Sequence, residues 1–166
     1  MKIRAIVVGL LLCALMVTGA MCQSGTTNIQ KPKVGYVPAG WYLSTDEAYN
    51  PTEGFGLVEY TDNQDLDFVQ IFYGPVPESL KGKENDSNAL IAQAVYEAIF
   101  SPDDTGPMTV AGRLAGYAET YDAYYNTWET EIAFVYDGTY VDIYTAYNAS
   151  EWDIQQAIDI IESIYF

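Results

Sequence analysis

The alternation of apolar and polar residues is clearest from Thr127 to Tyr147, where Asp137-Gly138 joins two β-rich runs. An Asp-Gly pair at such a junction favours a two-residue type I′ turn, because both central residues must adopt positive φ. Counting outward from this turn gives the strand register and separates the side chains into two faces. The apolar pairs are Tyr136 with Thr139, Phe134 with Val141, Ile132 with Ile143 and Trp128 with Tyr147. The pattern therefore predicts a hairpin with one core face and one wetter, acidic, tyrosine-rich face.

Similar patterns predict the other elements of the chain. Short strands are expected within 36–43, 55–60 and 66–73, and a longer strand over 108–121. Apolar residues recur at helical spacing from Ser87 to Phe100 and again from Ser150 to the end of the chain. Because most strands are joined as hairpins and the helices are few, the order predicts an α+β domain. We expect a central antiparallel sheet packed by helices.

The first residues have the layout of a secretory signal: two basic residues, an apolar run from Ala5 to Val17, and small residues before Cys22. Three outcomes are open, namely cleavage after Ala20, lipidation of Cys22, or an uncleaved anchor. All three predict an extracytoplasmic protein, secreted or anchored to the cell membrane, with membrane contact through the N-terminus only. We expect a signal peptide at 1–21, a flexible tether at 22–34 and one domain at 35–166.

The charge of the chain excludes one class of partner. Its 23 acidic residues outnumber its 7 basic residues, and the formal net charge is −16. Nucleic-acid binding depends on neutralising phosphates with lysine and arginine, so no nucleic acid is expected as a partner.

Several short motifs resemble those of PsbP-like domains. They are Val37-Pro38-Ala39-Gly40-Trp41, Val69-Gln70-Ile71-Phe72, Val110-Ala111-Gly112-Arg113 and the ending Ile158 to Phe166. The resemblance implies an α/β/α sandwich around an antiparallel sheet. Members of this fold family, including extrinsic photosystem proteins and Ran-binding relatives, are binding or assembly factors and not typically enzymes. The motifs are structural, so they assign no functional residue.

The inventory of reactive side chains argues against catalysis. The chain has no histidine, and its two cysteines, Cys13 and Cys22, lie in or beside the signal. Nucleophile–histidine catalysis and histidine-based metal sites therefore lack their central residue. No glycine-rich phosphate loop is present, and carboxylate pairs alone remain as candidate catalysts. We expect no enzyme activity and no cofactor.

Two groups of residues are candidate binding sites. An aromatic cluster around one loop could stack on a sugar or anchor a protein, although part of it could instead cap the core; its members are Tyr121, Tyr124, Tyr125 and Trp128. Three carboxylates on the wetter hairpin face could bind Ca²⁺ or Mg²⁺: Glu129, Glu131 and Asp142. The alternative for the carboxylates is a solvated sheet face, or one partly covered by the helix that begins at Ser87.

The function that these features favour is a secreted or lipid-anchored, non-catalytic binding or assembly module with an envelope or cell-surface protein as its partner. An extracellular domain that binds a glycan or Ca²⁺ is the alternative. A hydrolase that uses carboxylates alone comes third.

Overall fold

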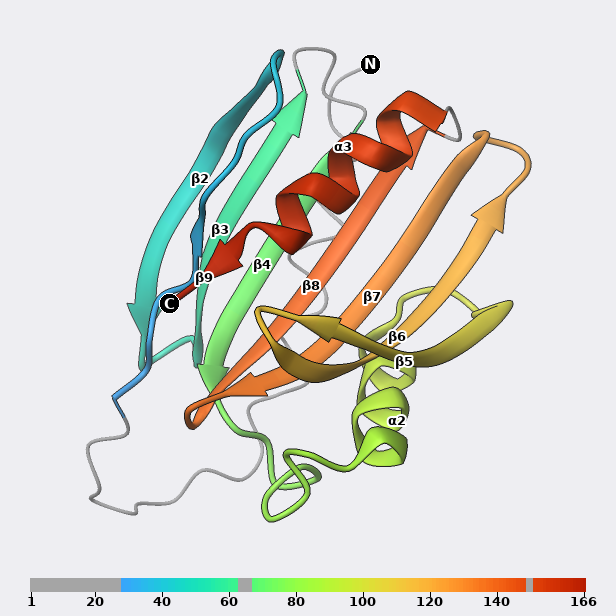
Figure 1. Cartoon of the computed structure of the whole chain (residues 1–166). Helices are drawn as coiled ribbons and strands as arrows, with labels where there is room; N and C mark the ends of the chain where they lie inside the picture. Colours follow the sequence, from blue (N-terminus) through green and yellow to red (C-terminus); the bar gives the residue numbers. More distant parts are fainter. Residues whose placement is uncertain (1–27, 63–66, 149–150) are drawn as a thin grey trace.

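A seven-stranded antiparallel sheet organises the computed structural model, which describes residues 28–62, 67–148 and 151–166 (Figure 1). Its strand order is β2-β3-β4-β8-β7-β6-β5, and every neighbouring pair is antiparallel. The strands are β2 (Trp41–Asn50), β3 (Phe55–Asp62), β4 (Phe68–Pro75), β5 (Asp104–Val110), β6 (Arg113–Asp122), β7 (Thr127–Tyr136) and β8 (Thr139–Asn148).

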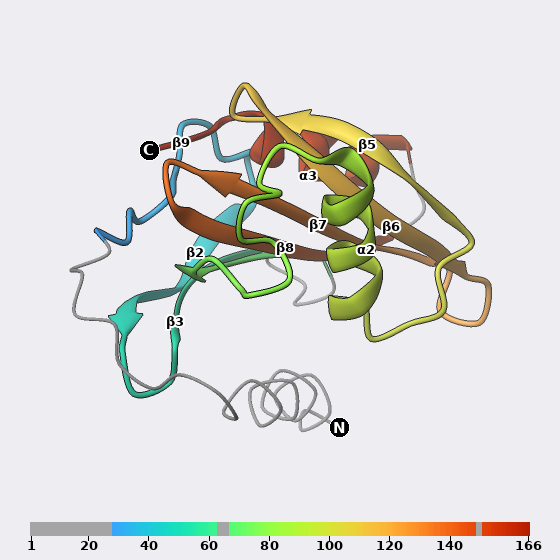
Figure 2. The same cartoon turned by 90° about the horizontal axis from the view of Figure 1, so that it is seen from below.

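Two helices cover opposite faces of this sheet. Helix α3 (Glu151–Glu162) contacts β8 and β4 on one face, and α2 (Ser87–Glu97) contacts β5, β6 and β7 on the other (Figure 2). A second, two-stranded sheet pairs β1 (Lys33–Val34) with β9 (Ile164–Tyr165). The expected α+β fold, with helices packed on a central antiparallel sheet, is confirmed.

The central hairpin has the register that its turn predicts. Asp137 and Gly138 adopt φ values of 44° and 85°, as a type I′ turn requires. Ile132 pairs with Ile143, Phe134 with Val141 and Trp128 with Tyr147, as the turn predicts. Because this face lies in the larger of two apolar cores, the turn also determines which side of the sheet faces α3.

Helix α2 lies unusually close to the sheet. Its N-terminus is capped by Asp86, whose carboxylate accepts hydrogen bonds from the backbone N–H groups of Asn88 and Ala89. A Cβ added at Gly116 on β6 would lie 2.2 Å from the backbone nitrogen of Ile91. Glycine at this position therefore allows the helix backbone to approach the strand directly.

The predicted long strand over 108–121 is wrong, because the chain reverses within it. Ala111 and Gly112 have φ values of 50° and 71° and form a turn between β5 and β6. The residues that read as a loop before Met108 belong to β5, which begins at Asp104. The turn is hard to see in the sequence, because alanine at positive φ is uncommon.

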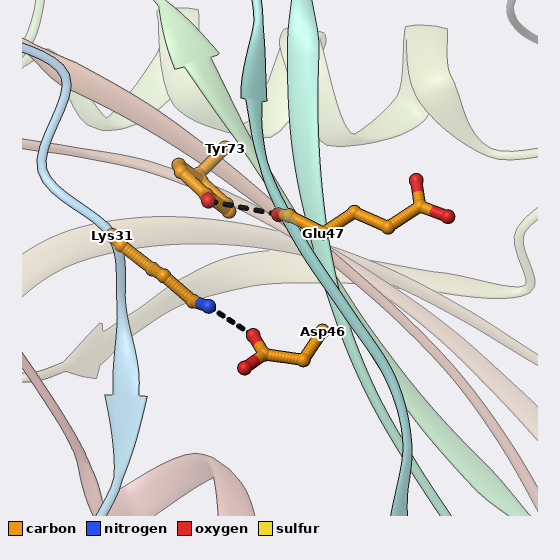
Figure 3. A network of polar contacts seen from close by, with 4 residues as sticks. All are labelled: Lys31, Asp46, Glu47 and Tyr73. Atoms are coloured by element: carbon orange, nitrogen blue, oxygen red, sulfur yellow. Dashed lines mark hydrogen bonds and ion pairs between the residues drawn. The ribbon is translucent and has the colours of Figure 1, made fainter.

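The expected tether also differs from the structure. Pro32 is buried, Lys33–Val34 is a strand, and the Gln30 backbone N–H donates to Thr139 Oγ1 at 2.9 Å. Lys31 pairs with Asp46 on β2, next to the hydrogen bond from the Tyr73 hydroxyl to the Glu47 carbonyl (Figure 3). Residues 29–34 therefore belong to the folded domain.

The predicted signal lies outside the described residues, and within those residues no helix is long and apolar enough to cross a membrane.

Substitution of Gly116 tests the close approach of α2. We expect Gly116→Ala to lower the free energy of unfolding by about 1–3 kcal/mol, because the added methyl group meets helix backbone that cannot rotate away. Chemical denaturation measures the change. Gly106→Ala on β5 is the control, since its added Cβ would meet the movable Tyr117 ring. Equal losses in the two variants would contradict this reason.

Two truncations test the N-terminal boundary. Deletion of residues 1–34 removes β1 and the buried Pro32, so we expect a loss of about 1–3 kcal/mol in unfolding free energy. Deletion of residues 1–27 keeps both and should retain the stability of the domain. Thermal unfolding of the two proteins gives the comparison, and equal melting temperatures would show that residues 28–34 contribute nothing.

Candidate partner-binding site

Two strongly exposed tyrosines lie at the turn between β6 and β7. We call this turn the aromatic tip and define it as Tyr121, Tyr124, Tyr125 and Trp128. Tyr124 is 87% exposed and Tyr125 is 69% exposed. Their rings contact each other edge to face, with centroids 4.7 Å apart. Both rings therefore project from the end of the sheet as one exposed aromatic pair.

The other two residues form the base of the tip. Tyr121 and Trp128 are opposite each other in the β6–β7 ladder, and their ring centroids are 5.4 Å apart. Tyr121 is 39% exposed, whereas Trp128 is half-buried and packs against the larger core. The structure thus brings all four predicted residues together but divides them into two exposed rings and two supporting rings.

Hydrogen bonds hold the backbone of the tip in place. Asp122 Oδ1 accepts from the backbone N–H groups of Tyr124 at 2.8 Å and Tyr125 at 3.2 Å. Asn126 has a φ of 55°, accepts from the Tyr121 hydroxyl at 2.7 Å and donates to Asn148 Oδ1 at 2.9 Å. Because the turn is fixed in this way, presenting the two tyrosines requires little further ordering.

The surroundings of the tip are acidic. Asp103 and Asp104 lie beside the end of β6, where Thr120 Oγ1 donates to Asp103 Oδ2 at 2.6 Å and Asp104 pairs with Glu119. Burial, and then the Asp104 charge, raise the pKa of Glu119. Arg113 is the last basic residue of the chain and is bound to Asp137 at the opposite end of β6 and β7. The tip therefore combines exposed aromatic rings with a negative flank.

The three carboxylates that were predicted to bind a metal are not arranged as a metal site. Glu129 accepts from the Tyr144 hydroxyl at 3.0 Å, whereas Glu131 and Asp142 are buried beneath α2. Within the described residues, no three or more histidine, cysteine, aspartate or glutamate side chains are placed to hold a metal ion. Helix α2 removes this part of the hairpin face from solvent, and metal binding by these carboxylates stays a prediction from the sequence.

The buried carboxyl groups have altered protonation. Burial raises the pKa of Asp142 to about 7, and the nearby Glu97 charge acts in the same direction. Burial, together with the Asp142 charge and a hydrogen bond to Asp142, raises the pKa of Glu131 well above its ordinary value. Burial also raises the pKa of Glu97. Two carboxyl groups so close together favour a shared proton over two negative charges.

Sequence reasoning missed Glu97 and its hydrogen-bond donor Gln93. Both are buried, and Gln93 Nε2 donates to Glu97 Oε1 at 2.6 Å. Gln93 and Glu97 lie on the same face of α2 as the buried residues Leu90 and Ala94, so helical spacing could have identified them. Two apolar side chains of the predicted helical pattern, Val95 and Ile99, are exposed.

Comparison with solved structures shows a likeness in fold to a known protein. No protein-family model matches the chain, and no curated protein matches it. The chain is similar in fold to the solution structure of cyanobacterial PsbP (CyanoP) from Synechocystis sp. PCC 6803, with a TM-score of 0.47 and 10% sequence identity. The match covers 89% of this chain and 98% of that chain. That protein belongs to the family that the sequence motifs resemble, and the match transfers no residue's role.

Cys22, the predicted lipidation site, lies outside the described residues. Its modification stays a prediction from the sequence.

Replacement of Asp122 tests the support of the aromatic tip. We expect Asp122→Ala to destabilise the domain by about 1 kcal/mol, because two backbone N–H groups of the turn lose their acceptor. Amide exchange measured by NMR should show faster exchange at Tyr124 and Tyr125 only. Asp122→Asn keeps an acceptor oxygen and is the conservative control. Unchanged exchange in Asp122→Ala would show that the turn is held by other contacts.

Proposed function

We propose that this chain is an extracytoplasmic, non-catalytic binding module that holds a protein partner through its aromatic tip. The observation that carries the proposal is the exposure of Tyr124 and Tyr125, at 87% and 69%, on a turn fixed by side-chain hydrogen bonds.

Such a pair of rings has the properties of a binding hot spot. Tyrosine offers a large contact area with few rotatable bonds, and its hydroxyl group can pair with a partner's polar atoms. Rings that are already ordered lose little conformational entropy on binding. The edge-to-face contact between Tyr124 and Tyr125 restricts both side chains before any partner arrives.

The charges around the tip indicate the chemistry of the partner. The flank contains Asp103, Asp104, Glu119 and Asp122, and no basic residue follows Arg113 in the sequence. A complementary surface would carry lysine or arginine around a shallow apolar depression. Cationic groups also bind favourably over tyrosine rings, so both features favour a basic protein surface.

The remaining features of the chain support a binding role outside the cytoplasm. The full sequence contains no histidine, and its first 21 residues have the pattern of a secretory signal. Both observations are consistent with a module that recognises a partner at the cell envelope or cell surface.

Site-specific cross-linking tests this function. In one variant of this chain a photo-reactive amino acid replaces Tyr125. In a second variant it replaces Tyr96, which is 73% exposed on α2. We expect a specific protein adduct from position 125 only. The adduct partner is then purified, and its affinity for the unmodified chain is measured.

The affinity measurement distinguishes the tip from the rest of the surface. We expect Tyr124→Ala and Tyr125→Ala each to weaken binding by about tenfold, as loss of a hot-spot ring does, and added salt to weaken it further. Tyr96→Ala is the matched control and should change affinity by less than about twofold, the size typical of a ring outside a hot spot. Equal effects at all three positions would contradict the proposal. Glycan binding that both tip variants lose would instead assign the site to a sugar.

A further inference from the structure

Three carboxyl groups lie buried together between α2 and the sheet, and we call Glu97, Glu131 and Asp142 the carboxyl cluster. Their exposed fractions are 7%, 3% and 9%. Glu131 and Asp142 come from neighbouring strands, and Glu97 is the last residue of the helix that covers them. The cluster therefore lies at the contact between α2 and the sheet.

Polar groups around the cluster are arranged to hold the helix end. Ser79 Oγ donates to Gln93 Oε1 at 2.7 Å, which directs the Gln93 amide nitrogen toward Glu97. The Tyr140 hydroxyl and Asp142 Oδ1 are buried and have no hydrogen-bond partner among the described residues. Tyr140 lies near Gln93 and Asp142 without reaching hydrogen-bond geometry with either. The hydrogen bonding of the buried polar groups is therefore incomplete, and the strength of this contact depends on which carboxyl groups are protonated.

Within the part of the chain that the structure describes, the groups that face the cluster supply no positive charge. Helix α2 contributes Gln93 and Glu97; β7 contributes Glu131 and, farther along, Glu129; β8 contributes Tyr140, Asp142 and Tyr144. Strand β6 presents Gly116 and Ala118, β4 presents Phe72 beside Asp142, and the segment before α2 presents Ser79. Among the described residues, every ion pair of a lysine or arginine is made elsewhere: Lys31 with Asp46, Lys81 with Glu78 and Arg113 with Asp137.

Ionisation of the cluster opposes the docking of α2 for three reasons. Buried carboxylates lose hydration without gaining a cation, and neighbouring negative charges repel one another. Glu97 also lies at the C-terminal end of α2, where the helix dipole disfavours a negative charge. Protonated carboxyl groups avoid all three penalties and can donate hydrogen bonds.

We propose that the carboxyl cluster is a proton-operated latch that fastens the C-terminal half of α2 to the sheet. With the carboxyl groups protonated, the latch is closed. Ionisation opens it, and α2 moves away from β7 and β8 while its N-terminal half stays held at Gly116. The raised pKa values of all three groups place the loss of stability above the ordinary carboxyl range, up to about pH 7 for Asp142.

Opening would change the surface of the protein. The smaller apolar core beneath α2 includes Ala118, Ala133, Val135 and Tyr140, and these residues would gain solvent exposure. The aromatic tip lies on a different part of the sheet, so this inference does not depend on the proposed function.

Hydrogen–deuterium exchange of the whole chain tests the latch. The protection of α2 amides, corrected for intrinsic exchange rates, is compared with that of β7 and β8 from about pH 5 to about pH 8, a range that spans the pKa of about 7 for Asp142. We expect α2 protection to fall by about tenfold or more over this range while strand protection changes less, since one unit of pKa shift corresponds to tenfold. Constant α2 protection would overturn the proposal.

Variants assign the effect to the cluster. Glu131→Gln with Asp142→Asn removes the titrating groups and keeps their shape, so the pH dependence should disappear. Glu119→Gln is the control, because burial also raises the pKa of Glu119 but that residue lies outside the cluster; its pH dependence should match that of the unmodified protein. A pH dependence that persists in the double variant would overturn the latch.

A direct titration covers the case in which the double variant does not fold. NMR of the side-chain carboxyl carbons in the unmodified protein should show Glu131 and Asp142 titrating above the ordinary range for carboxyl groups. Ordinary pKa values of about 4 for both groups would overturn the proposal.

Discussion

The register of the β7–β8 hairpin is the constraint on which the rest of this structure depends. The turn at Asp137 and Gly138 determines which residues of the two strands face each other. A slip of one residue would turn Ile132 and Phe134 away from the larger core and bring Glu131 and Ala133 into it, because side chains alternate across a strand. Strands β4 and β6 pair with the outer edges of this hairpin, so its register also sets theirs.

The two faces of the sheet are stabilised in different ways. The face beneath α3 is apolar, with Ile71, Phe134 and Ile143 fully buried in one continuous core. The face beneath α2 combines a small apolar core with carboxyl groups that carry no paired cation. Close packing at Gly116 supplies contact for the N-terminal half of α2, whereas the C-terminal half depends on buried polar groups. We therefore expect stability on this face to depend on the protonation of its buried carboxyl groups.

The aromatic tip and the carboxyl cluster share strand β7. Strand β7 carries Trp128 at the base of the tip and Glu131 three residues later beneath α2. The exposed rings are held by turn hydrogen bonds near the end of the sheet, where no helix covers them. Exposure of Tyr124 and Tyr125 adds nothing to the apolar core, and it leaves both rings accessible to the partner proposed above.

The sequence by itself determined the elements that depend on local chemistry. The Asp-Gly turn and the alternation around it gave the hairpin register, the helical spacing from Ser87 gave the start of α2, and the absence of histidine removed whole classes of catalytic site. The clustering of four aromatic residues around one loop was also visible, because they are close in sequence.

What only the tertiary structure decided was which polar residues are buried. The sequence left open whether Glu131 and Asp142 are solvated or covered by α2, and it did not single out Glu97. Their environment depends on α2 lying across distant strands, at a distance that Gly116 permits. The pairing of β4 with β8 and of residues 33–34 with the C-terminus likewise joins segments far apart in sequence. Such contacts depend on how the elements pack against one another, so no local pattern of residues predicts them.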